Sequence, residues 1–120
     1  MEDFRGFFNR KIAEGNRSNV KIIRNTEANG DAYQIKPYET VVIVYNTGSY
    51  TQALQLPAVA ESKGMRLYIA FPDAGGTNAI ADHDDSYYPS WTDLVPDADG
   101  DDVLLENTGR GWAVVFNGIA

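Results

Sequence analysis

The chain has 120 residues, which predicts one domain with a small hydrophobic core. It has no cysteine, which excludes disulfides and thiolate metal sites, and no run of about 18 apolar residues that would span a membrane. Residues 1–36 hold seven Lys/Arg against five Asp/Glu (+2), whereas residues 37–120 hold three against twelve (−9). Because phosphates would repel this acidic body, we expect no nucleic acid partner.

Residues 1–18 combine three phenylalanines with several basic residues. The apolar set follows spacings of three, one and four, which fits one face of a short helix. It lacks the continuous apolar stretch of a secretory signal. We interpret this segment as an extended or short-helical arm that docks on a partner, and the alternative is a terminal helix packed on its own domain. The candidate docking residues are Phe4, Arg5, Phe7, Phe8, Arg10, Lys11 and Ile12.

The pattern from residue 20 to residue 56 predicts four strands. Residues 20–24 and 32–36 flank a turn rich in Asn, Gly and Asp, which predicts a hairpin. Residues 40–45 are β-branched and apolar on both faces, which predicts a central strand or one covered by a neighbouring subunit. Residues 50–56 are predicted as the return strand.

A short helix is predicted next, at residues 57–63. Pro57 suits the first helical position, and Gly64 suits the position after the last turn, where a positive φ is needed. So short a helix is not stable alone, and we expect it to cap the end of a β barrel or sandwich. Residues 66–71 and 78–81 are predicted as further strands, separated by a Gly-rich turn.

The last third of the chain begins with an acidic stretch. Residues 82–102 hold eight Asp but also aromatic and aliphatic residues, which predicts folded loops with a short strand around 90–95. Residues 103–106 and 112–116 form a predicted hairpin, in which Trp112 is a core residue. We detect no internal repeat.

These elements predict an all-β fold, mainly an antiparallel barrel or sandwich, with the one short helix and the N-terminal arm. We divide the chain into a docking arm with a first hairpin, residues 1–36, and a β domain, residues 37–120. No cofactor is expected.

The candidate metal ligands are Asp97, Asp99 and Asp101, which alternate like the start of a calcium-binding EF-hand loop. The sixth and twelfth positions of that loop would be Asp102 and Thr108, where the motif needs Gly and Glu. We therefore expect an acidic turn without a metal.

Catalytic signatures are missing from the sequence. His83, the only histidine, lies among aspartates and is interpreted as a surface residue. No serine has the context of a nucleophile elbow. We expect no enzyme, and a small hydrolase that uses acids in residues 82–102 is the least favoured alternative.

An aromatic cluster of Tyr87, Tyr88 and Trp91 lies in the acidic stretch. Such residues stack on sugars or form interfaces. The alternative is a satellite core beneath a long loop.

From residue 38 to residue 116 the chain resembles a β module that is common in tailed-phage virion proteins. The pattern is a strand, Leu-Pro-x-Ala, Gly-x-Arg, Tyr-x-Ile, a Gly-rich turn, a polar stretch and a hairpin with Trp. The matching residues are Leu56, Pro57, Ala58, Gly64, Arg66, Tyr68, Ile69, Asp85, Tyr88, Val103, Leu105, Gly109 and Trp112. The acidic insertion at residues 88–102 departs from the pattern, which runs more directly from the turn to the final hairpin.

The resemblance implies a compact, usually trimeric β barrel or sandwich without a catalytic centre. The chain has no fibre shaft, is short and begins with Met, which favours a small stand-alone decoration (cement) protein on the capsid exterior. Its expected partners are the major capsid protein and two further copies of itself. The alternative is a tail or fibre component that binds a host-surface glycan.

Overall fold

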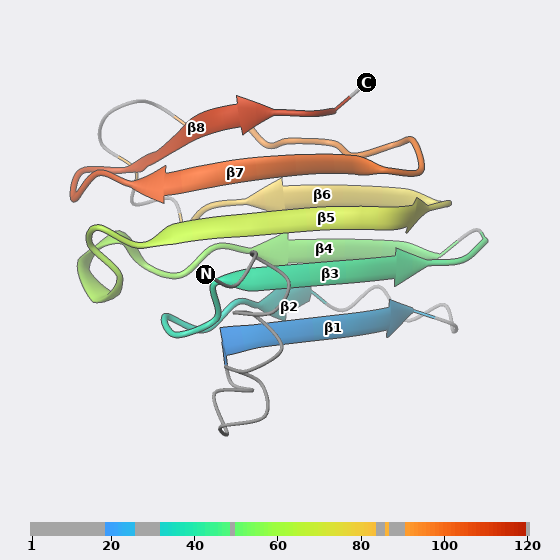
Figure 1. Cartoon of the computed structure of the whole chain (residues 1–120), viewed down its shortest axis with the longest axis horizontal. Helices are drawn as coiled ribbons and strands as arrows, with labels where there is room; N and C mark the ends of the chain where they lie inside the picture. The colour runs from blue at the N-terminus through green and yellow to red at the C-terminus, as the bar shows by residue number, and fades with distance from the viewer. Residues whose placement is uncertain (1–18, 26–31, 49, 84–85, 87–90, 120) are drawn as a thin grey trace, which may run out of the picture.

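The computed structural model describes residues 19–25, 32–48, 50–83, 86 and 91–119. Within them the fold is all-β, and the strands lie in two separate sheets rather than one closed barrel (Figure 1). Among these residues no helix is long and apolar enough to cross a membrane. The strands are β1 (Val20–Asn25), β2 (Ala32–Gln34), β3 (Val41–Asn46), β4 (Thr51–Gln55), β5 (Arg66–Ala74), β6 (Thr77–Ala81), β7 (Asp101–Asn107) and β8 (Trp112–Asn117).

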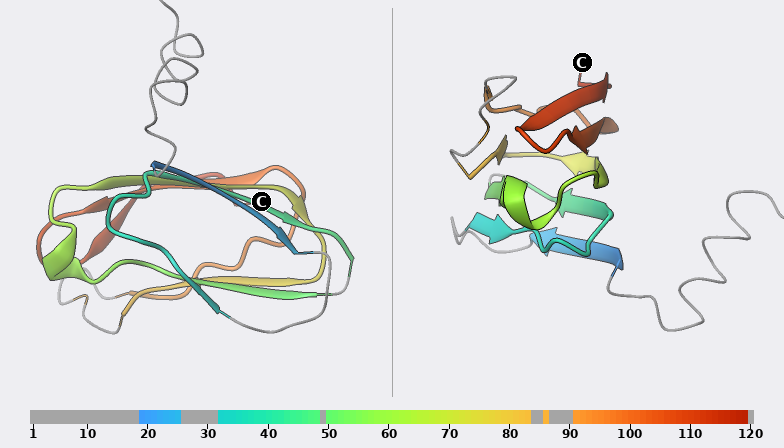
Figure 2. Two further views of the ribbon diagram at one scale, coloured as in Figure 1. Left: turned by 90° about the horizontal axis from the view of Figure 1, so that it is seen from below. Right: turned by 90° about the vertical axis from the view of Figure 1, so that its left-hand side faces the viewer.

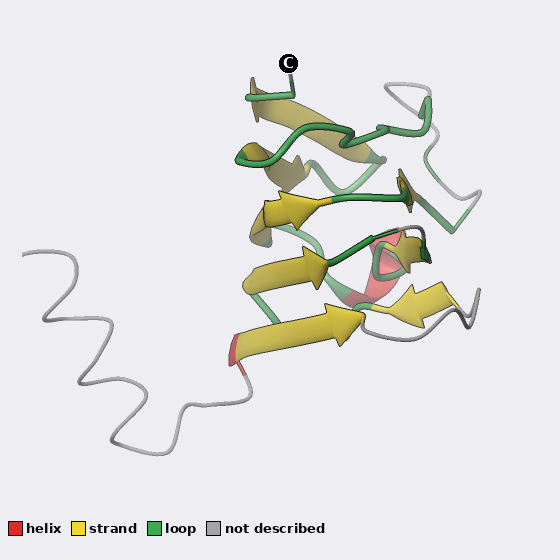
Figure 3. Cartoon of the chain, turned by 90° about the vertical axis from the view of Figure 1, so that its right-hand side faces the viewer, coloured by secondary structure: helices red, strands yellow, loops and turns green. Residues whose placement is uncertain are grey.

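The chain winds between the two sheets. The five-stranded sheet has the order β1-β3-β5-β7-β8 and the three-stranded sheet the order β2-β4-β6, so each of the first three windings adds one strand to each sheet. The four strand pairs among β1–β6 are parallel. β7 and β8 form an antiparallel hairpin at the end of the larger sheet, and β7 also pairs antiparallel with β5. Figures 2 and 3 show the two layers from the side and from one end.

The expected antiparallel pairing is wrong for most of the molecule, because four of the six strand pairs are parallel. β1 and β2 do not form the first hairpin, and β4 is not the return strand of β3, because each pair is divided between the sheets. The boundary suggested at residue 36 therefore runs through both sheets. The final hairpin, β7 with β8, is confirmed.

The first two windings correspond to a short sequence repeat. β1 (VKIIRN) and β3 (VVIVYN) share Val, Ile, a β-branched residue and Asn at matching positions, 21 residues apart. They lie in register, with Val20 beside Val41 and Asn25 beside Asn46. The expectation of no internal repeat is thus wrong, because similar residues occupy similar places in successive windings.

Buried amides hold one end of the windings together. The Nδ2 of Asn25 donates hydrogen bonds to the Oε1 of Gln52 (3.1 Å) and to the carbonyl oxygen of Thr51 (3.0 Å). One winding later, the Nδ2 of Asn46 bonds to the Oδ1 of Asn78 (2.7 Å) in the equivalent way. Because breaking hydrogen bonds between buried groups is costly, this ladder of Nδ2 contacts favours the observed register of the two sheets, although the Oδ1 atoms of Asn25 and Asn46 are buried without a partner.

The hydrophobic core lies between the two sheets. Alternate residues of β3, β5 and β7 point into it, as the two-residue period of a strand requires. Trp112, expected in the core, is buried, and its Nε1 donates a hydrogen bond to the Pro57 carbonyl oxygen (3.0 Å). Val114 and Phe116, which alternate with it along β8, are exposed.

The predicted helix at residues 57–63 is a single 3-10 turn, η2 (Val59–Glu61). Val59 is buried, and Gly64 has the positive φ expected of it, +80°. The Nδ2 of Asn107 on β7 donates hydrogen bonds to the Val59 carbonyl oxygen (3.0 Å) and to Ser62 (2.9 Å). This turn is therefore held at one end of the two layers by the final hairpin.

Candidate functional site

The side of the five-stranded sheet that faces away from the three-stranded sheet, hereafter the outer face, is apolar. One row of paired residues crosses all five strands and contains only aliphatic or aromatic side chains. A second row adds two isoleucines and an alanine. The outer face consists of Val20, Ile22, Val41, Ile43, Tyr68, Ala70, Leu104 and Phe116.

Solvent reaches this face. Ile22 is 50% exposed, Phe116 54% and Tyr68 36%, while Val41 and Ile43 are half-buried by their neighbours. Neither η2 nor any described strand lies over it, since the smaller sheet covers the opposite side (Figure 2). Contiguous apolar surface of this kind marks interaction sites on soluble proteins.

Polar groups border the apolar rows. The Nε of Arg66 and the Oε1 of Glu106 form an ion pair at 2.7 Å, and Tyr68 donates a hydrogen bond to Asp102 at 2.7 Å. Burial, this hydrogen bond and the carboxylate's charge raise the pKa of Tyr68 to about 12. At the β1 side, the Arg24 guanidinium stacks on the ring of Tyr45, 4.6 Å from its centroid.

The edge at β1 carries an inward-facing charge. Lys21 pairs with the core residue Val42, and its ammonium lies 5.1 Å from the centroid of the Tyr33 ring. The Tyr33 hydroxyl bonds to the buried Glu39 carboxylate at 2.9 Å. Burial and this bond hold the pKa of Tyr33 well above its ordinary value. An inward lysine at an edge strand is a known obstacle to the addition of another strand.

The opposite edge, β8, is irregular. The pairing of β7 with β8 shifts between Leu104 and Leu105, which leaves Val115 as an extra residue. Val114 and Val115 are exposed, so apolar surface continues from the outer face round this edge. A β-bulge distorts the edge and hinders regular strand pairing.

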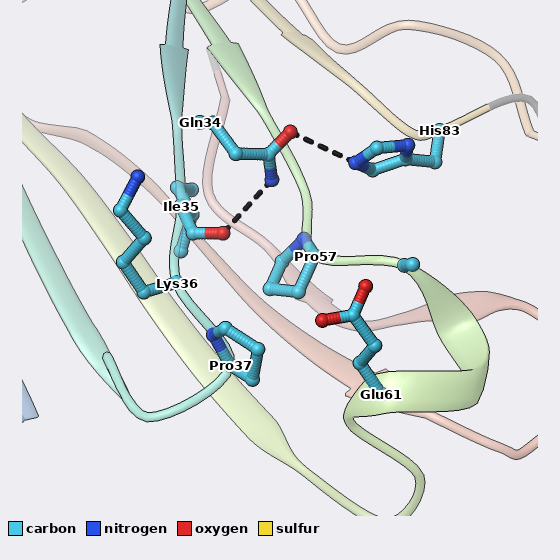
Figure 4. A pocket seen from close by; sticks show the side chains of 8 residues that line it. Gln34, Ile35, Lys36, Pro37, Pro57, Glu61 and His83 are labelled. Atoms are coloured by element: carbon cyan, nitrogen blue, oxygen red, sulfur yellow. Dashed lines mark hydrogen bonds between the residues drawn. The ribbon is translucent and has the colours of Figure 1, made fainter.

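A separate pocket of about 280 Å³ opens at the end of the three-stranded sheet (Figure 4). Its upper wall is a hydrogen-bonded pair, with the Nε2 of His83 2.8 Å from the Oε1 of Gln34. The Glu61 carboxylate lies beside the ring of Pro57 on another wall. The full lining is Gln34, Ile35, Lys36, Pro37, Pro57, Ala58, Glu61 and His83.

The aspartates considered for calcium act as turn acceptors instead. The Oδ2 of buried Asp101 accepts hydrogen bonds from the backbone N–H groups of Asp97 (3.0 Å) and Ala98 (3.1 Å). The Oδ1 of Asp99 accepts one from the N–H of Ala74 at 2.8 Å. Among the described residues no three His, Cys, Asp or Glu side chains converge on a possible metal position.

Most other candidate residues lie outside the part of the chain that the structure describes. This holds for the docking arm, residues 1–18, and for Tyr87 and Tyr88. Trp91 is described and is half-buried against the hydrophobic core, with its indole N–H buried and unpaired. This position matches the satellite-core alternative for Trp91 better than an exposed stacking surface.

No protein-family model and no curated protein matches the chain. The candidate site therefore rests on its own geometry. Of the outer face and the pocket, only the outer face was partly predicted, from residues 40–45, which are apolar on both faces. The contributions of β1, β5 and β8 to the same rows were missed, because they depend on strand order.

Proposed function

We propose that this chain is a virion structural protein that decorates the exterior of a phage capsid as a trimer and stabilises the shell, and that it is not an enzyme. The observation that carries the proposal is the exposed apolar outer face, which suits assembly with other protein surfaces. Assignment to virions and to a β-sandwich module rests on the sequence resemblance across residues 38–116.

In this proposal the N-terminal arm binds the major capsid protein. Three phenylalanines and Ile12 supply apolar anchors, and Arg5, Arg10 and Lys11 supply positive charge. Strand β1 begins just after the arm and forms an edge of the larger sheet. Many copies on a shell add weak contacts together through avidity, so a modest affinity per arm is sufficient.

The test is co-sedimentation of the purified protein with undecorated capsid shells. The full-length triple variant Phe4→Ser, Phe7→Ser, Phe8→Ser should lose binding, because it removes the apolar anchors. The matched control is Val95→Ser, which removes an exposed apolar side chain (54%) elsewhere. If the triple variant decorates shells as well as the wild type, docking by the arm is wrong.

The pocket favours a second candidate function, recognition of a host-surface glycan by a tail or fibre component. Proline rings and a set of amide, carboxylate and imidazole groups surround a small cavity, as in many saccharide sites. A glycan array should then give a signal that His83→Ala and Glu61→Gln abolish and that Asp93→Asn, an exposed residue that does not line the pocket, leaves intact. No saccharide signal would exclude this role.

A further inference from the structure

We propose that the outer face binds a second copy of this chain, with the β1 half of one face against the β7–β8 half of the next. The inference goes beyond the proposed function and is independent of capsid binding. It concerns only strands that the structure describes.

The first step is that the contact uses the face and not the sheet edges. At one edge, Lys21 points inward over Tyr33, and a strand added there would have to bury its ammonium. At the other edge, the bulge at Val115 breaks the regular ladder. Both edges therefore resist pairing, whereas the face between them carries a continuous apolar row.

The second step is that the charges beside the outer face favour a second copy of this chain as its partner. Arg24 lies on the outer side of β1, and Asp102 lies on the outer side of β7, on the same strand as Glu106, which is already paired with Arg66. β1 and β7 are three strand spacings apart, about 14 Å, so these charges attract each other only weakly within one copy. Placing the β1 half against the β7–β8 half of another copy brings them together. Pairing β1 with β1 would instead gather the cations.

The third step concerns symmetry. When two copies pack face to face about a two-fold axis that lies between the sheets and runs along the strands, the β1 half of each copy lies on the β7–β8 half of the other. The contact is then made twice, so a dimer is the smallest assembly that satisfies it.

The size of the face sets the strength of association. One row across five strands, about 24 Å by about 7 Å, and a second across three strands, about 14 Å by about 7 Å, project to roughly 260 Å² per copy. A stable complex buries about 800 Å² per partner. We therefore expect reversible association that depends on protein concentration, strengthened where copies are held close together.

The first test is sedimentation velocity on the full chain without shells, from roughly 10 μM to roughly 1 mM. The wild type should associate, and Ile22→Lys and Phe116→Lys should each weaken association at least about tenfold, because each buries an unpaired ammonium. Val95→Lys, an equally exposed position off the face, is the control. Circular dichroism verifies that each variant is folded. A wild type that stays monomeric throughout, or variants that associate normally, would overturn the proposal.

The second test uses the lack of cysteine in this chain. In the double variant Ile22→Cys, Phe116→Cys, mild oxidation should give covalent oligomers. The two cysteines cannot join within one copy, because β1 and β8 lie about 19 Å apart, whereas a disulfide requires Cα atoms within about 7 Å. Single variants should remain monomeric after oxidation. Covalent dimers of Ile22→Cys alone would mean that β1 faces β1 and would refute the arrangement.

Discussion

A single glycine shows how closely the windings stack. Gly76 has a φ of +81°, and a Cβ built on it would lie 2.2 Å from the backbone oxygen of Tyr50 in the preceding winding. Neither atom can move aside, because Thr77 donates its N–H to that same oxygen at 2.9 Å. Any side chain at this position must therefore push two successive windings apart.

We predict that Gly76→Ala lowers the free energy of unfolding by about 3 kcal/mol or more, from backbone strain and the clash together. Gly100→Ala is the matched control, since Gly100 has a similar φ of +91° with no atom within 4 Å of its Cβ position. It should cost only about 1–2 kcal/mol. Urea unfolding followed by tryptophan fluorescence measures both. Equal losses would show that the close stacking is unimportant.

The buried amide ladder makes a second prediction at the scale of single residues. Asn46→Ala leaves the buried Oδ1 of Asn78 without this donor, and it removes one of two donors to the Tyr50 carbonyl oxygen, which keeps the Thr77 N–H. We expect a loss of about 2 kcal/mol in unfolding free energy. Thr47→Ala, the exposed neighbour, should change it by less than about 0.5 kcal/mol. Similar values for the two variants would contradict a structural role for the ladder.

At the scale of elements, the positions of the strands were largely predictable, but their partners were not. The β-branched run of β3, the alternation of apolar residues in β5 and the Gly-containing turn before Trp112 are local signals. The patterns of β3 and β5 suit parallel and antiparallel neighbours equally well. The short turn-like segment between β1 and β2 therefore suggested a hairpin, although the chain crosses there to the other sheet.

The repeat was the signal that could have indicated the true topology. The Asn that ends β1 and the Asn that ends β3 are 21 residues apart, which is too long for a hairpin and suits one full winding. The pocket was out of reach of sequence reasoning, because Gln34, Glu61 and His83 come from three separate elements or loops. Their proximity follows only from the order of the windings.

The pairing of β5 with β7 makes a prediction about pH. Because Asp102 helps to raise the pKa of Tyr68 to about 12, Asp102→Asn should lower it toward the ordinary value of about 10. A raised pKa in the folded state stabilises the fold below pH of about 10, and this contribution disappears as the pH rises to about 12. The variant should lose less stability across that range.

Titration of the tyrosine ring signals by NMR measures this effect, with Tyr68→Phe to assign the resonance. Asp93→Asn, which changes an exposed carboxylate other than the one that Tyr68 binds, should leave the Tyr68 titration unchanged. If Asp102→Asn also leaves it unchanged, the hydrogen bond at 2.7 Å contributes nothing to the ionisation of Tyr68.

At the scale of the whole molecule, the uneven charge has a structural counterpart. The first 36 residues are net basic and supply β1, while the net acidic remainder supplies β7. The two strands lie on opposite halves of one sheet, so Arg24 on the outer side of β1 and Asp102 on the outer side of β7 lie on either side of the apolar rows. Such a surface is complementary to a second copy of itself, in the arrangement proposed above.

Salt should therefore weaken self-association. Raising the salt concentration from about 0.05 M to about 0.5 M shortens the screening length to a few ångströms, which should raise the dissociation constant severalfold. Arg24→Gln should weaken association at low salt and reduce this salt dependence, whereas Arg110→Gln, in the exposed turn between β7 and β8, should do neither. Sedimentation velocity measures all three proteins. Purely apolar contacts would strengthen with an excluded salt, so association that rises with salt would show that charge does not orient the copies.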